Sequence, residues 1–141
     1  MSEKSQNKVS QQEIDKVINA FFGEFDNRNS RVPDFAEFGM LFTDTSMIYK
    51  HNGIGYMPMS VEHFIDPRAK MLTDGTLQDF HEWEVEQQTI IADGIATRVS
   101  RYAKAGLLNG EDYQGEGVKH IQLLKTDNGW KIVSVIWVDD L

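Results

Sequence analysis

Polar and apolar residues alternate along most of the second half of the chain, and this pattern limits the fold more than any other. It starts at Leu77 and covers residues 78–91, 95–104, 117–126 and 130–139. A period of two is typical of β-strands, because successive side chains point to opposite faces of a sheet. Asp93-Gly94 and Asp127-Asn128-Gly129 lie between the members of each pair and favour tight turns. The pattern predicts two long antiparallel hairpins, joined by a Gly-rich acidic loop over residues 106–116.

The first half of the chain begins with the pattern of an amphipathic helix. Ser10 and Glu13 have the spacing of a capping box, in which the two side chains satisfy free amides of the first helical turn. Apolar residues then recur every three or four positions, at Ile14, Val17, Ile18, Phe21, Phe22 and Phe25. We expect a helix over residues 10–28, a disordered tail over residues 1–9 and a single domain over residues 10–141.

Shorter elements connect this helix to the long strands. Pro33 and Asp34 favour a short helix that ends at Gly39. Residues 40–50 and 54–57 are typical of two short strands around a turn.

A third helical segment begins at Ser60, which is a good N-cap. Pro67 lies inside its pattern and predicts either two short helices or a kink, because proline removes an amide donor. Helices followed by strands make the fold class α+β. The helices are the available cover for one face of a long curved sheet.

Charge and residue types exclude several classes of function. The 141 residues include 22 acidic and 14 basic side chains, for a net charge of −8. This argues against partners such as nucleic acid or an anionic membrane, whose phosphates need a basic face. The absence of cysteine excludes disulfides, thiolate metal sites and cysteine nucleophiles. No apolar run approaches the ~20 residues of a membrane span, and no signal peptide is visible. We expect a soluble, cytoplasmic protein.

Three stretches of the sequence resemble a known superfamily. They are the Phe-rich first helix, Leu41-Phe42-Thr43-Asp44, and the ending Asn128-Gly129-Trp130-Lys131-Ile132-Val133-Ser134 with Trp137. Together with the element order they resemble the nuclear transport factor two-like superfamily, and within it the small bacterial SnoaL-like (polyketide-cyclase-like) domains. The resemblance implies a cone-shaped, cystatin-like fold, in which a curved antiparallel sheet wraps around N-terminal helices. It also implies a pocket inside the cone and a homodimer through the other sheet face.

Members of this superfamily have unrelated activities. Ketosteroid isomerase, scytalone dehydratase and limonene epoxide hydrolase resemble one another in fold, and other relatives only bind partners. The resemblance therefore implies an architecture and leaves the function open.

The Asp93-Gly94 turn sorts the side chains of the first hairpin between the two sheet faces. Counting outward from it, one face carries His81, Trp83, Val85, Gln87, Ala96, Arg98, Ser100 and Tyr102. The other carries Glu82, Glu84, Glu86, Gln88, Thr97, Val99 and Arg101, which suit water. Aromatic and polar side chains are mixed in small-molecule pockets, so we expect the first set to line the pocket. A three-residue turn or a β-bulge would reverse the assignment.

The second hairpin is apolar on both faces. With Asn128-Gly129 as its turn, His120 faces Trp137, and the opposite face carries Ile121 and Leu123. Two apolar faces need two partners, of which one is the set of helices. We expect the other to be a second subunit, so that the chain forms a homodimer through the sheet face.

Two histidines, His120 and His81, are the candidate catalytic residues. Each lies beside a tryptophan in this register, Trp137 and Trp83 respectively. An imidazole titrates near ~6.5, and burial lowers its pKa, which favours a neutral general base. The alternative for each is a partly buried histidine that a backbone carbonyl satisfies.

Arg98 and Tyr102 are the first candidates for binding a ligand. A guanidinium that points into a pocket needs a carboxylate, which comes either from the ligand or from the protein itself. The candidate ligand-binding set also includes Trp83, Ser100, Trp137 and Tyr49.

No metal or cofactor motif is complete. His81-Glu82 begins like the zinc motif H-E-x-x-H, but Val85 stands at the position of the second histidine. Gly53-Ile54-Gly55 lacks the third glycine of a dinucleotide fingerprint. We expect neither a metal nor a cofactor.

Two functions of different classes remain open. The first is a protein that binds a small, mostly apolar ligand with a polar or anionic end, either without catalysis or as a cofactor-free acid–base isomerase, dehydratase or cyclase. The second is a non-catalytic dimerisation or partner-binding module whose cone is filled by its own side chains. A closed, dry cone below about 300 Å³ would favour the second.

Overall fold

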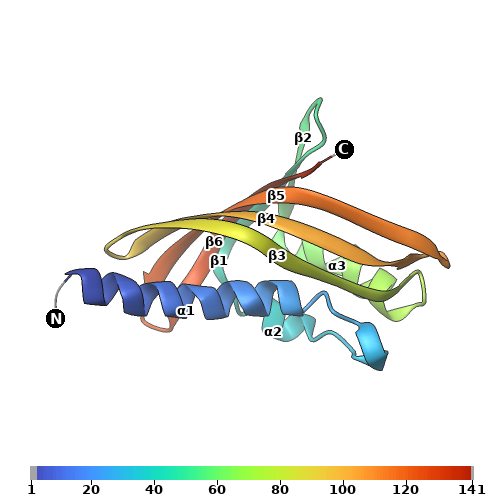
Figure 1. Ribbon diagram of the computed structural model, residues 1–141, viewed down its shortest axis with the longest axis horizontal. Helices are drawn as coiled ribbons and strands as arrows, with labels where there is room; N and C mark the ends of the chain where they lie inside the picture. Colours follow the sequence, from blue (N-terminus) through green and yellow to red (C-terminus); the bar gives the residue numbers. More distant parts are fainter. Residues whose placement is uncertain (1–2, 141) are drawn as a thin grey trace.

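A computed structural model describes residues 3–140, which form one curved sheet with helices on its concave side (Figure 1). In chain order the elements are α1 (Glu3–Gly23), the 3₁₀ turn η1 (Arg28–Ser30), α2 (Phe35–Gly39), β1 (Phe42–His51), β2 (Tyr56–Ser60), α3 (Val61–Thr73), β3 (Leu77–Ala92), β4 (Ile95–Leu108), β5 (Glu111–Thr126) and β6 (Gly129–Asp140). The strand order is β2-β1-β6-β5-β4-β3. The α+β prediction is confirmed.

The sheet contains one parallel pair, where an entirely antiparallel sheet was predicted. β3, β4, β5 and β6 form an antiparallel meander, and β1 pairs antiparallel with β2. β1 runs parallel to β6, with Ile48 opposite Val135 and Lys50 opposite Trp137. The last strand therefore lies inside the sheet, beside the first.

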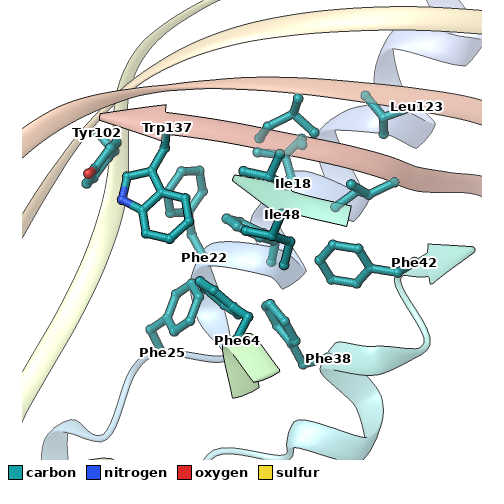
Figure 2. Close-up of a cluster of buried hydrophobic side chains, with 14 of the residues drawn as sticks. Ile18, Phe22, Phe25, Phe38, Phe42, Ile48, Phe64, Tyr102, Leu123 and Trp137 are labelled. Carbon is teal, nitrogen blue, oxygen red and sulfur yellow. The ribbon is translucent and has the colours of Figure 1, made fainter. Parts of the chain in front are cut away.

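The core lies between α1 and the concave face of the sheet. The apolar face predicted for the first helix is confirmed, since Ile14, Ile18, Phe21, Phe22 and Phe25 are all buried. Their rings and branches meet side chains from α2, α3 and the central strands (Figure 2). Burial of such side chains contributes about 1.5–3 kcal/mol each, so this face holds α1 on the sheet.

The first helix differs from its prediction at both ends. α1 begins at Glu3, so Ser10 lies inside the helix, and the part of the predicted tail from residue 3 onward is helical. Residues 1–2 lie outside the described residues. α1 ends at Gly23, and Asn27 then binds α3 and β3. Its side chain donates to the carbonyls of Leu72 and Leu77 at 3.0 and 2.8 Å and accepts from the Phe80 amide at 2.8 Å. These bonds draw the chain away from a helical path.

No helix among residues 3–140 is long and apolar enough to cross a membrane.

The third helix, α3, is continuous through Pro67, where two short helices or a kink were predicted. Its N-terminus is capped as expected, because the Ser60 hydroxyl accepts from the His63 amide at 3.1 Å. Pro67 deprives the His63 carbonyl of its helical partner. Both residues are exposed, so the unpaired carbonyl lies on the solvent side of the helix, where losing one hydrogen bond does not interrupt it.

The predicted loop over residues 106–116 is instead a continuation of two strands. β4 and β5 pair as far as Leu108 and Glu111 and turn at Asn109-Gly110. These two residues have φ angles of 52° and 82°, as a two-residue type I′ turn requires. Gly106 and Gly115, which suggested a loop, lie inside β4 and β5 instead, and Gly117 lies inside β5.

Gly117 makes room on the concave face for the side chain opposite it. It pairs with Tyr102, and a Cβ at Gly117 would overlap the Tyr102 hydroxyl and the Val138 carbonyl. At Gly115, a Cβ would lie 2.8 Å from Cε of Lys104, which is the far end of a flexible side chain. A methyl group at Gly117 would therefore disturb the structure more than a methyl group at Gly115.

We expect Gly117→Ala to lower the free energy of unfolding by about 1–3 kcal/mol, since the overlap involves backbone and a buried ring. Gly115→Ala is the matched control and should change it by less than about 1 kcal/mol. Urea unfolding of both variants measures the difference. Equal stability of the two variants would show that Tyr102 does not depend on Gly117.

Candidate functional site

A cavity of about 210 Å³ lies between α3 and the concave side of the sheet. Its apolar wall includes Phe25 and Phe80, Phe64 and Leu72 of α3, and Trp137 of β6. Figure 2 shows Phe25, Phe64 and Trp137 gathered on one side of the core, with Tyr102 beside Trp137. The wall also carries polar and charged side chains, so the cone is not filled at this end. The cavity volume is below about 300 Å³, and size alone therefore favours the non-catalytic module. The charged lining favours a ligand.

Asp139 is the centre of the first polar group in the cavity wall. It accepts a hydrogen bond from the Tyr102 hydroxyl, and Nζ of Lys104 and of Lys50 lie 3.4 and 3.5 Å from its oxygens. Burial opposes ionisation of Asp139, but the Tyr102 hydrogen bond and the Lys104 charge outweigh it and lower the pKa of this carboxyl. Burial, together with the same carboxylate, raises the pKa of Tyr102. The pair is therefore an ionised carboxylate and a neutral phenol.

Lys119 projects into the same cavity from β5 and is 3% exposed. Its Nζ lies 4.1 Å from the ring centroid of Tyr102 and 5.1 Å from that of Trp137. Glu82 is its charged partner, with Oε1 3.7 Å from Nζ. Burial lowers the pKa of Lys119, Arg68 lowers it further, and Glu82 opposes the change.

Arg68 projects into the cavity from α3. Its guanidinium donates to the Phe64 carbonyl at 2.9 Å and stacks over the Phe64 ring, with Cζ 3.8 Å from the centroid. Burial lowers its pKa, and Glu82 is the first of the groups that oppose this. Within residues 6–139 no carboxylate oxygen lies within 4.0 Å of this guanidinium, so it lacks the close ion pair that a buried arginine needs.

The charges around the cavity do not cancel. The described lining includes four basic side chains, of Lys50, Arg68, Lys104 and Lys119, and two acidic ones, of Glu82 and Asp139. A concave site with an excess of positive charge attracts small anions. The chain as a whole is acidic, so this excess is local to the cavity.

Several solved structures of other proteins have the same arrangement of helices and strands as this chain. An NTF2-like superfamily protein from Salmonella enterica serovar Typhimurium LT2 is 16% identical, with a TM-score of 0.72 over 93% of this chain and 91% of that one. The hexachlorocyclohexane dehydrochlorinase LinA-type3 from Novosphingobium barchaimii LL02 is 13% identical, with a TM-score of 0.77 over 99% and 92%. A candidate scytalone dehydratase from Novosphingobium aromaticivorans DSM 12444 is also 13% identical, with a TM-score of 0.77 over 98% and 89%.

The chain has the NTF2-like fold. The fold expected from the sequence resemblance is thereby confirmed, and the narrower SnoaL-like assignment stays a prediction. No protein-family model matches the chain, and no curated protein matches its sequence. At identities this low the likeness establishes the fold alone.

Within the NTF2-like cone, the sequence-predicted residues divide into three groups. Tyr102 and Trp137 line the cavity as expected. Arg98 and Ser100 point inward but are buried away from the cavity lining. The others do not line it: His81, His120, Trp83 and Tyr49.

A β-bulge explains why His81 and Trp83 lie elsewhere. Glu84 is opposite Tyr102 and Glu86 is opposite Arg101, so Val85 has no partner. The side chains that precede the bulge are therefore reversed, and Glu82 and Glu84, predicted to face water, point inward. His81 stacks on Trp83 on the opposite face, with ring centroids 4.4 Å apart, and its Nδ1 is buried without a hydrogen bond within the described residues. Burial and the nearby Arg28 lower the pKa of His81, as predicted, but outside the cavity.

The second hairpin turns one residue earlier than predicted, and β6 then contains a β-bulge. Thr126 pairs with Gly129, so the turn is Asp127-Asn128, and Gly129 with φ 94° follows it. Leu123 pairs with Ile132 and Gln122 with Ser134, so Val133 has no partner.

The bulge moves His120 to the outside, because the turn alone would leave it on the same face as Trp137. His120 is then opposite Ile136 and exposed, and Lys119 takes the inward position opposite Trp137. Tyr49 lies on β1 opposite Ile136, with its ring against Tyr56, and also faces outward.

Arg98 has its carboxylate partners within the protein. Its guanidinium contacts Asp15 of α1 at 2.6 Å and Glu84 of β3 at 2.5 Å, and its side chain is 3% exposed. Of the two alternatives drawn from the sequence, this is the internal ion pair. The triad ties α1 to the sheet, and no atom of Arg98 lines the cavity.

The six charged side chains of the cavity lining were all missed from the sequence: Lys50, Arg68, Glu82, Lys104, Lys119 and Asp139. The helical spacing already indicated Arg68, which lies four residues after Phe64 and four before Leu72, on the buried face of α3. Lys119 and Glu82 depended on the bulges in β6 and β3.

No group of three or more histidine, aspartate or glutamate side chains that is able to hold a metal ion occurs in the part of the chain that the structure describes.

We expect Arg98→Met to lower the free energy of unfolding by about 3 kcal/mol, because it leaves Glu84 buried without a partner. Asp15→Asn is the control and should lower it by about 1 kcal/mol or less, since Asp15 is 42% exposed and water screens its charge. Chemical denaturation of both variants tests this. Wild-type stability of Arg98→Met would contradict a structural role for the arginine.

We expect Lys119 to titrate below the ordinary lysine value of about 10.4. Between its lowered pKa and the ordinary value the unfolded state binds more protons, so this group makes stability rise with pH across that window. The side-chain Cε signal, assigned with Lys119→Arg and followed by NMR, reports the titration. A titration midpoint at or above the ordinary lysine pKa would contradict this account, in which the Lys119 ammonium is buried without enough stabilising partners.

Proposed function

We propose that this protein binds a small organic anion with an apolar body in the cavity and performs cofactor-free acid–base chemistry on it. The observation that carries the proposal is Arg68, a half-buried guanidinium that lines the cavity and has no ion-pair partner among the described residues. A carboxylate of the ligand supplies the missing partner, and guanidinium and carboxylate groups fit each other in two parallel hydrogen bonds.

The cavity volume limits the size of the ligand. Drug-sized ligands occupy pockets of about 300–1,000 Å³, whereas this cavity measures about 210 Å³. The volume corresponds to roughly seven water molecules at about 30 Å³ each. The ligand is therefore a compact molecule, whose apolar body lies against Phe64 and Trp137 and whose anionic end meets Arg68.

Glu82 is the group best placed to accept a proton from such a ligand. Its carboxylate lines the cavity, is 11% exposed, and has Lys119 at 3.7 Å as its ion-pair partner. It makes no hydrogen bond within the described residues, so its lone pairs are available to a substrate proton. The Lys119 ammonium beside it stabilises negative charge that develops on the substrate. The candidate base thus moves from the histidines to Glu82.

This arrangement suits the removal of a proton next to an electron-withdrawing group, which begins isomerisation, dehydration and cyclisation. Two of the solved structures with this fold are named for eliminations, as a dehydrochlorinase and a candidate dehydratase. Their names support the reaction class by analogy of fold alone.

The second candidate, a non-catalytic module, draws on the outer face of the sheet. Trp83, Val85, Ile136 and Val138 are partly exposed there, away from the cavity. A second copy of the chain would cover them, so the homodimer stays a prediction, as does the cytoplasmic location. A homodimer by itself is compatible with the first candidate, because the outer face and the cavity lie on opposite sides of the sheet.

We expect the protein to bind benzoate in preference to the neutral benzamide, and Arg68→Gln to weaken benzoate binding about 10- to 100-fold, the usual loss for a charged hydrogen bond. Arg101→Gln, on the outer face, is the charge-matched control and should leave binding unchanged. NMR titration of the Trp137 indole signal measures four affinities: those of the wild-type protein for benzoate and benzamide, and those of the two variants for benzoate. Equal binding of benzamide, or full binding by Arg68→Gln, would contradict the proposal and favour the module.

A further inference from the structure

The Lys119 amine has an environment that does not stabilise a structural lysine. Its Nζ is enclosed by aromatic rings and makes no hydrogen bond with any residue from 6 to 139, and its carboxylate partner Glu82 lies at 3.7 Å. A buried ammonium needs both a close counter-ion and hydrogen bonds. A methionine would fill the same space among apolar neighbours such as Ile121, so stability alone does not account for a lysine here.

We propose that Lys119 forms an imine with the carbonyl carbon of a small oxo acid whose carboxylate Arg68 holds. The inference rests on the proposed function, since it takes the anion of that site to be an oxo acid. Both cations lie over the same ring: Cζ of Arg68 is 5.5 Å and Nζ of Lys119 is 5.1 Å from the Trp137 centroid. A compact oxo acid that covers this ring places its two functional groups against the two cations.

The step balances through Glu82. The Lys119 ammonium gives a proton to the Glu82 carboxylate, and the free amine forms a C–N bond to the carbonyl carbon while the carbonyl π electrons move to oxygen. Glu82 protonates that oxygen, which leaves a carbinolamine whose nitrogen carries two hydrogens and the positive charge. Glu82 takes one of these protons and passes it to the hydroxyl, which leaves as water while the nitrogen lone pair forms the C=N bond. One oxo acid and one ammonium have become one iminium and one water, and Glu82 is again a carboxylate.

Iminium formation serves the acid–base chemistry proposed for the site. An iminium withdraws electrons more strongly than a ketone and acidifies the adjacent C–H bond. Glu82, released from its proton, is the carboxylate that accepts that hydrogen.

The neighbouring lysines are not suited to this role. Lys104 and Lys50 lie within 3.5 Å of Asp139, and the charge of Lys104 is further stabilised by Tyr113. Such a counter-ion keeps an amine protonated and un-nucleophilic. Lys104 is therefore the matched control within the chain. It lies in the same cavity, but its surroundings stabilise the charged form of the amine, whereas those of Lys119 oppose it.

Borohydride trapping tests the inference. The full chain is incubated with pyruvate, reduced with sodium borohydride, and digested for peptide mass spectrometry. We expect one reduced pyruvate adduct, on Lys119, that disappears in Lys119→Arg and persists in Lys104→Arg. If Lys119→Arg fails to fold, the peptide that carries the adduct in the wild-type chain still decides the question.

Each other result overturns the inference. An adduct spread evenly over surface lysines, or located on Lys104, shows that Lys119 is not selected. If no adduct forms while pyruvate displaces benzoate in the NMR titration, the imine is wrong and the anion site stands. If no adduct forms and neither anion binds, the proposed function fails as well.

Discussion

The arrangement of the interior depends on one extra residue in β3. Val85 has no partner on β4, so the strand shifts by one position between Glu84 and Glu86. Side chains alternate along a strand, and a one-residue shift therefore exchanges the two faces for residues 81–84, as far back as a second shift between Gln78 and His81. Glu84 turns inward to Arg98, and Glu82 turns inward to Lys119. Without the bulge both cations would lie buried with no carboxylate from β3.

The buried charges fall into two kinds, and the difference locates the site. Arg98 is fully paired, with Asp15 and Glu84 at hydrogen-bond distance, and it joins α1 to the sheet. Lys119, which is buried, and Arg68, which is half-buried, lack such close partners among the described residues and line the cavity. A folded chain retains poorly satisfied buried charge where function requires it. The positive excess of an acidic protein is thereby concentrated at one cavity.

The sequence predicts the elements well and the cavity in part. Helical spacing indicated the buried face of α1, and counting from Asp93-Gly94 placed Arg98, Ser100 and Tyr102 inward. Beyond Glu86 the count fails, because alternation does not reveal an inserted residue. A second inserted residue, Val133 in β6, exchanged His120 for Lys119. Asn109-Gly110 is typical of a two-residue turn, but the nearby Gly106 and Gly115 favoured a loop instead.

The pairing of β3 with β4 in solution tests this account most directly. Cross-strand NOEs between backbone protons distinguish the two registers, because opposed residues lie close only in the correct one. The account predicts NOEs that place Glu84 opposite Tyr102 and Glu86 opposite Arg101, with Val85 unpaired. An unbroken ladder, with Val85 opposite Tyr102 and Trp83 opposite Lys104, would contradict it and return the glutamates to the outer face.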